Sequence, residues 1–132
     1  MTDAAWTLQQ AIYDALSGIS ADVYDYVPAS VSKPFVLIGD ITGPELSSKS
    51  SDGQELTVTI EAITEGRGKK ASHDLANEII QAINSKTLLD LSPNYKNYVT
   101  TLDNTRTIVE DNGQGSAIYR KLLDYTFSIH EL

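Results

Sequence analysis

The sequence contains no cysteine, which excludes a disulfide framework and a cysteine-based metal site. Basic residues are also few: 10 Lys and Arg stand against 18 Asp and Glu, giving a formal net charge of −8. Proteins that hold nucleic acid by neutralising its phosphates need clustered cations. Here the cations form only short pairs such as Lys69-Lys70 and Arg120-Lys121. This balance argues against stable nucleic-acid binding, although a surface past which DNA slides would tolerate it.

Long hydrophobic runs are missing as well. The longest uninterrupted apolar run is a few residues, far below the roughly 20 that span a bilayer. The N-terminal segment MTDAAW carries an acid and lacks the basic start of a secretory signal. With 41% hydrophobic and 21% charged residues, the 132-residue chain fits one globular domain over residues 1–132. We therefore expect a soluble, cytoplasmically made protein with no membrane partner.

Apolar residues at helical spacing predict two helices. The first covers about Asp3 to Ser17 and the second about Lys70 to Asn84. We expect Asp3 to accept hydrogen bonds from the free N–H groups at the start of the first helix. Gly18 is expected to end that helix in the left-handed conformation.

Alternating and β-branched segments predict five strands. Asn112-Gly113 is a strong hairpin signal between the last two strands. Short turns join most neighbouring strands, which favours antiparallel pairing. We predict an α+β fold, a mainly antiparallel sheet of about five strands with two helices packed on one face. The predicted strands cover Val23–Val27, Phe35–Ile38, Leu56–Ala62, Tyr98–Glu110 and Tyr119–Ile129.

The sequence contains no pattern typical of a catalytic or cofactor site. EGRGKKAS resembles a phosphate-binding loop, but Ile63 stands where the motif needs glycine, and Lys70 where it needs Ser or Thr. His73 and His130 lack partners at metal-ligand spacing, and His73-Asp74 fits a solvated helix start better than an acid–base pair. No G-x-S-x-G elbow is present. We predict that the protein is not an enzyme and binds no cofactor or metal.

The segment from Phe35 to Ile38 is apolar at every position. Such a strand must be covered on both faces, yet two helices on one side of the sheet cover only one. Either a loop of the same chain covers the second face, or another subunit does. Phe35 and Leu37 are therefore candidates for a subunit interface, and a self-assembling ring would account for the apolar strand and the missing active site together.

Two motifs frame the proline-containing loop, VYDYVP over Val23–Pro28 and PFVLIG over Pro34–Gly39. They resemble the signature of the tail-terminator (tail-completion) proteins of long-tailed bacteriophages and gene-transfer agents. The element order is similar to that family over nearly the whole chain, from the Leu8–Leu16 helix to the final strand. One departure is ITEGRG after the third strand, where the family commonly carries an aromatic residue.

The resemblance implies a structural virion protein at the head–tail junction, assembled in the host cytoplasm. It implies a homo-oligomeric ring, a hexamer in the family, that caps the finished tail tube and stops polymerisation of the tube protein. The same ring would present a surface to the head connector or stopper protein. DNA would pass through its hole without specific binding.

Within such a ring, the polar loops LSSKSSDG and EDNGQGS are candidates to contact neighbouring subunits or tail layers, because they are polar and lack periodicity. An idle surface loop explains the same features. Besides Phe35 and Leu37, the candidate interface residues are Ser48, Lys49, Ser50, Asp52, Asp111, Asn112 and Gln114. The candidate wall of the hole is the polar face of the third strand, formed by Glu55, Thr57, Thr59 and Glu61.

Two other interpretations stay open. The seven tyrosines suit a protein interface, so a monomeric peptide- or small-ligand-binding module on the sheet is one alternative. A head-closure or minor tail protein of similar fold is the other. A stable multimer in solution would favour the ring over a binding module.

Overall fold

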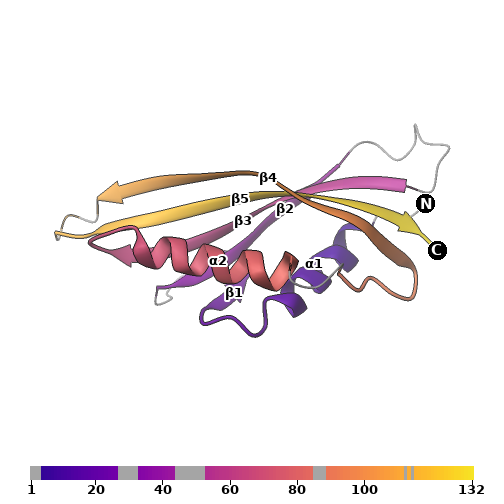
Figure 1. The fold of residues 1–132 in the computed structure, drawn as a ribbon, viewed down its shortest axis with the longest axis horizontal. Coiled ribbons are helices and arrows are strands. Elements are labelled where there is room, and N and C mark those ends of the chain that lie inside the picture. Colours follow the sequence, from indigo (N-terminus) through magenta and orange to yellow (C-terminus); the bar gives the residue numbers. More distant parts are fainter. Residues whose placement is uncertain (1–3, 27–32, 44–52, 85–88, 112, 114) are drawn as a thin grey trace.

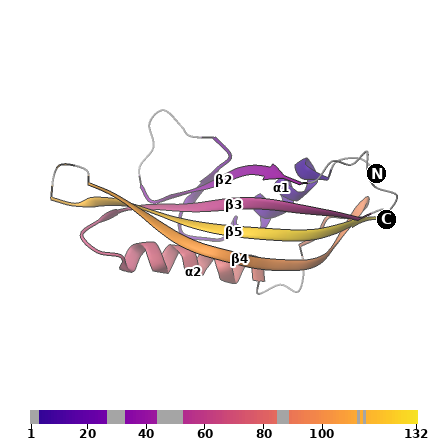
Figure 2. The same ribbon diagram turned by 90° about the horizontal axis from the view of Figure 1, so that it is seen from above.

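The computed structural model of the protein describes residues 4–26, 33–43, 53–84, 89–111, 113 and 115–132. Its five strands form a single sheet in the order β1-β2-β3-β5-β4 (Figures 1 and 2). The α+β fold class predicted from the sequence is confirmed. Along the chain the elements are α1 (Ala5–Ala15), β1 (Asp22–Tyr24), β2 (Phe35–Thr42), β3 (Gly53–Gly66), α2 (Lys70–Asn84), β4 (Tyr95–Asp111) and β5 (Ala117–Glu131).

The sheet is antiparallel except at β1. β1 pairs parallel to β2, with Asp22 opposite Phe35 and Tyr24 opposite Leu37. The expectation that neighbouring strands join through short turns does not hold here. Residues 25–34 separate the two strands, which gives the chain room to return to the start of β2 and run in the same direction. β1 is therefore a short parallel edge strand.

Both helices cover the same face of the sheet (Figure 1). Along β3 every second side chain, from Leu56 to Ala62, points into the core that α1 and α2 close. This follows from the two-residue period of a strand and the apolar stripe of each helix. The other main contributors to this core are Leu8, Ile12, Leu75, Ile79, Ile83, Leu123, Phe127 and Ile129.

Tyr125 is the largest fully buried side chain in this core. It is 0% exposed, and its ring stacks on that of Phe127 with centroids 5.8 Å apart. Its hydroxyl has no hydrogen-bond partner among the described residues. Burial away from water disfavours the phenolate and raises the pKa of Tyr125 to about 12.

The helix bounds match the prediction for α2 and differ for α1. α1 ends at Ala15, and Gly18 does not have a positive φ angle, so the predicted left-handed end is wrong. The last turn closes instead by local bonds, in which the Ser17 hydroxyl donates to the Asp14 carbonyl oxygen over 2.8 Å. Asp3, the predicted cap, lies outside the described residues.

The apolar segment of β2 is covered on both faces within one chain. Val36 and Ile38 face the helices. On the opposite face Phe35 and Leu37 are only 6% and 9% exposed, and with Ile63 they form a second cluster against which Tyr24 and Ile118 pack. A second subunit is therefore not needed to cover this strand, and the physical reason for placing Phe35 and Leu37 at a subunit boundary is removed.

We predict that Leu37→Ala lowers the free energy of unfolding of the isolated chain by about 2–3 kcal/mol, because it empties part of a packed cluster. Urea denaturation, at a concentration where light scattering shows monomers, measures this. The control is Val99→Ala on the 53%-exposed Val99, which should cost under about 1 kcal/mol. If Leu37→Ala leaves the monomer unchanged and only weakens assembly, the residue belongs to an interface instead.

Candidate interaction surfaces

The groups considered for chemistry have ordinary structural partners. The Asp74 carboxylate forms a salt bridge with the Lys70 ammonium, with Oδ2 and Nζ 2.9 Å apart, and so its ionic partner is not the neighbouring His73. The ring of His130 meets that of Tyr98 edge-on, with centroids 4.7 Å apart. Within the described ranges, no group of three or more His, Cys, Asp or Glu side chains could hold a metal ion. In the same part of the chain, no helix is long and apolar enough to cross a membrane.

The face of the sheet that points away from the helices is polar along β3 from Glu55 to Glu61 and apolar around Phe35, Leu37 and Ile63. All four residues predicted to line a hole lie on it, because Glu55, Thr57, Thr59 and Glu61 alternate with the core positions of β3. β5 pairs antiparallel with β3 and brings Asp124 opposite Thr59. We call this surface the outer face. Its geometry agrees with the predicted outward direction of the four residues, whereas their place in an assembly stays a prediction.

Arg120 links three strands on the outer face. Its Nε and Nη2 atoms donate to Glu61 Oε1 over 3.1 and 2.7 Å, and its Nη1 lies 3.5 Å from Glu110 Oε1. The hydrogen bonds from Arg120 to Glu61 raise the pKa of the guanidinium, with partial burial opposing them. One arginine therefore ties β3, β5 and β4 together and neutralises carboxylate charge on this face.

Asp124 is the centre of a second group on the outer face. The Thr59 hydroxyl donates to Asp124 Oδ1 over 2.6 Å, and Arg106 Nη2 lies 3.4 Å from the same oxygen. The bond from Thr59 is the main cause that lowers the pKa of Asp124, Arg106 adds to it, and burial opposes it. Further out, the Thr126 hydroxyl donates to Asp103. Hydrogen bonds within the chain thus occupy many polar groups of this face.

Thr59→Val should raise the pKa of Asp124 toward its ordinary value of 3.8, because the carboxylate loses its main donor. A lowered folded-state pKa stabilises the protein above the ordinary value, and that stability is lost as the pH falls through the folded-state value. The variant should therefore lose less stability on acidification than the wild type. NMR titration of the Asp124 carboxyl measures the shift. Thr57→Val is the control, since Thr57 bonds Thr42, and an equal shift in both variants would contradict the assignment.

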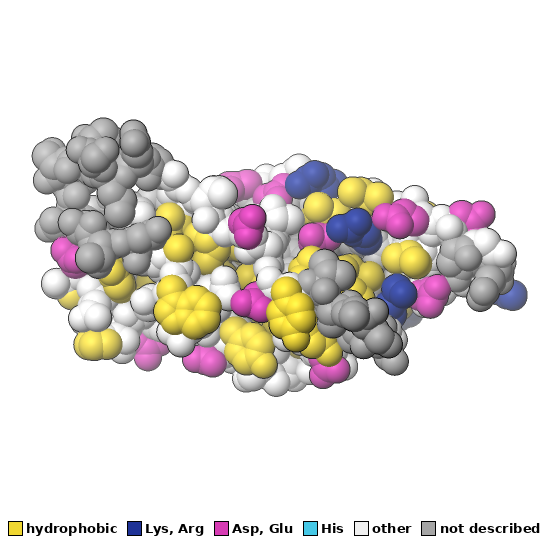
Figure 3. Space-filling view, turned by 180° about the vertical axis from the view of Figure 1, so that it is seen from behind, with side chains coloured by type: hydrophobic (Ala, Val, Ile, Leu, Met, Phe, Trp, Pro, Cys, Tyr) yellow, Lys and Arg dark blue, Asp and Glu magenta, His cyan; other side chains and the backbone are white. Residues whose placement is uncertain are grey.

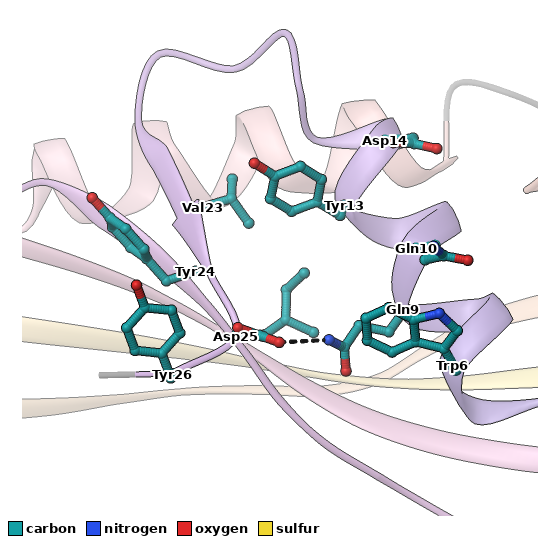
Figure 4. A pocket seen from close by; sticks show the side chains of 10 residues that line it. Trp6, Gln9, Gln10, Tyr13, Asp14, Val23, Tyr24, Asp25 and Tyr26 are labelled. Atoms are coloured by element: carbon teal, nitrogen blue, oxygen red, sulfur yellow. Dashed lines mark hydrogen bonds between the residues drawn. The ribbon is translucent and has the colours of Figure 1, made fainter. Parts of the chain in front are cut away.

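A hollow of about 600 Å³ lies between α1 and β1 (Figure 4). Figure 3 shows hydrophobic and acidic side chains next to one another on the side of the molecule that is seen from behind. The aromatic side chains of the hollow are unusually accessible: Trp6, Tyr13 and Tyr26 are 63%, 52% and 63% exposed. Gln9 Nε2 donates to Asp25 Oδ2 over 2.8 Å, which joins α1 to the residue after β1. We call this the aromatic hollow, and its full lining is Trp6, Gln9, Gln10, Tyr13, Asp14, Val23, Tyr24, Asp25, Tyr26 and Ile38.

Sequence reasoning did not identify the aromatic hollow. It noted that the seven tyrosines suit an interface, without placing Tyr24 or Tyr26 beside Trp6. A signal was present, because Trp6, Gln10 and Tyr13 follow one another at spacings of four and three and so share a second stripe of α1. What the sequence could not supply was the parallel pairing of β1, which places Tyr24, and Tyr26 after the strand, in the same hollow as that stripe.

The predicted loop contacts are mostly outside the described part of the chain. Ser48, Lys49, Ser50, Asp52, Asn112 and Gln114 lie outside the described residues. Asp111 is exposed at the end of β4, and its Oδ1 accepts a 2.8 Å bond from the Gly113 N–H. Gly113 and Gly115 have φ angles of 77° and 83°, as a tight connection between β4 and β5 requires. The loop roles stay predictions.

Comparison with known proteins gives the family. A search of curated protein sequences found no match. Among solved structures, a chain of the structure titled "Virion of native gene transfer agent (GTA) particle" has a similar fold. Its TM-score is 0.78 at 19% identity, covering 98% of this chain and 99% of that one. The sequence profile of the family described as "Tail completion protein gp17" matches residues 10–127, and the chain therefore belongs to the tail completion protein gp17 family.

Proposed function

We propose that the protein forms a homo-oligomeric ring that ends the phage tail tube and joins it to the head. Its family places it among the structural proteins of virion tails, and the match over residues 10–127 is the observation that carries the proposal. The partners would be further copies of the chain, the tail tube protein and a head connector or stopper protein. The protein would act by contact alone, without catalysis.

The charge distribution supports a role in which DNA passes without binding. The net charge is −8. Two of the arginines, Arg120 and Arg106, are paired with carboxylates on the outer face. A cation already held by a carboxylate attracts phosphate weakly, and like charges repel. The outer face would therefore suit the wall of a channel for DNA.

The aromatic hollow supports a second candidate function. Exposed aromatic rings beside amides and carboxylates are typical of grooves that bind extended peptides. A monomeric module that binds a peptide in this hollow would need no ring. The oligomeric state separates the two functions.

The ring predicts a stable multimer of this chain, seen by native mass spectrometry of the purified protein or at the ends of isolated tails. Cells that produce the particle without this protein should make tubes of uncontrolled length that lack heads, because tube growth has no stop. Electron microscopy of tail lengths measures this, with expression of the chain from a plasmid as the control. Tails of normal length, joined to heads, in the absence of the protein would contradict the proposal.

If the outer face lines the channel, Glu55→Lys should slow DNA delivery without changing tail length. Glu55 is exposed on this face, and a ring of added cations would hold passing phosphates. The measurement is DNA release from purified particles, with Glu55→Gln as the control that removes charge without adding a cation. Unchanged release with Glu55→Lys in assembled particles would place the outer face away from DNA.

A further inference from the structure

We propose that the aromatic hollow of one copy receives a cationic surface on β4 of the next copy in the ring. This inference rests on the proposed ring and names the contact that would hold it together. The cationic surface is centred on β4, with Lys96, Tyr98 and Val99, and includes His130 of the neighbouring strand β5.

The aromatic hollow has acidic charge without a matching cation. Its lining contains two carboxylates, Asp14 and Asp25, and neither Lys nor Arg. Neither carboxylate makes a salt bridge with any residue that the structure describes. The exposed rings of Trp6, Tyr13 and Tyr26 line this hollow, while Val23 and Ile38 of the lining pack in the core (Figure 4). A partner that suits this hollow is therefore apolar with a positive charge.

The cationic surface has that composition. Tyr98 and Val99 are 48% and 53% exposed. The Lys96 ammonium lies 5.1 Å from the centre of the Tyr98 ring, and it makes no salt bridge within the described ranges. A register shift between Asn97 and Val99 leaves Tyr98 without a paired residue on β5, and a bulge of this kind re-aims side chains at a sheet edge.

The two surfaces belong to opposite edges of one sheet. β1, beside the aromatic hollow, is the first strand in the sheet order and β4 is the last. A ring of identical subunits needs two different, complementary surfaces on each copy, so that every contact is head to tail. Aromatic and aliphatic groups would exclude water from this contact, while Lys96 approaches Asp25 or Asp14.

A second exposed apolar pair on β4 fits the hollow less well. Ile108 and Val109 are 43% and 50% exposed. The arginines on that part of the sheet, Arg106 and Arg120, already pair with carboxylates of their own chain. Lys96 is the cation on β4 that remains available to a partner, which is why we assign the contact to its surroundings.

Charge reversal tests the contact in the full chain. Asp25→Lys and Lys96→Glu should each raise the protein concentration needed for half assembly at least about tenfold, because each places like charges face to face. The double variant, with Asp25→Lys and Lys96→Glu, should need a concentration for half assembly within about threefold of that of the wild type. The matched control combines Asp25→Lys with Lys69→Glu on the turn before α2, which has the same net charge and should stay impaired.

Cross-linking tests the same contact without reversing any charge. The natural chain has no cysteine, so Asp25→Cys with Lys96→Cys supplies the only thiols. A short bismaleimide should convert this variant into a ladder of multimers, in solution and on isolated tails. Asp25→Cys with Lys69→Cys should give no ladder beyond dimers. Trp6 is the only tryptophan, and its emission should shift to the blue on assembly as the hollow is covered.

The outcomes separate this inference from the proposed function. Wild-type multimers that resist both charge reversals would overturn the contact and leave the ring standing. The same holds if the variant with Asp25→Cys and Lys96→Cys forms multimers but gives no ladder. Absence of multimers both in solution and at tail ends would overturn the ring and the contact together. If the charge-reversal variants still form multimers but no longer join heads, the hollow would bind a head or tail protein instead. That result would also overturn the contact between copies.

Discussion

The pairing of β3 with β5 is the constraint on which the other features depend. The two strands pair continuously from Gly53 and His130 to Gly66 and Ala117. Because side chains alternate along each strand, this one register sends the apolar set toward the helices and the polar set outward. A slip by a single residue would exchange the two faces. The core under α1 and α2 and the ionic groups around Arg120 and Asp124 therefore have the same origin.

The features that depend on local periodicity were predictable. Consecutive residues show the two-residue alternation of β3 and β5 and the apolar stripe of α2. The core and the outer face could therefore be predicted from the sequence. Features that depend on how distant segments return were not predictable. Neither the parallel pairing of β1 nor the aromatic hollow beside it has a local signal, because both depend on which strand β1 pairs with and in which direction. The predicted end of α1 was wrong because a glycine after a helix can adopt the left-handed conformation but does not have to.

The strand from Phe35 to Ile38 shows how a fold can cover an apolar segment within one chain. Its second face is closed by Tyr24, Ile63 and Ile118, so the burial of this strand requires no other copy of the chain. The surfaces left for contact are those where aromatic or aliphatic groups remain exposed beside unpaired charges. In the proposed ring, this division would place folding and assembly on different residues, so a substitution could disturb one without the other.

The buried Tyr125 sets a limit to the alkaline tolerance of the fold. Burial raises the pKa of Tyr125 to about 12 in the folded protein, compared with an ordinary value of 10.0. The unfolded chain therefore loses this proton first, and every rise in pH from about 10 towards 12 favours unfolding. Because Tyr125 belongs to the core that the helices close over the sheet, strong base would weaken the interior of the subunit itself.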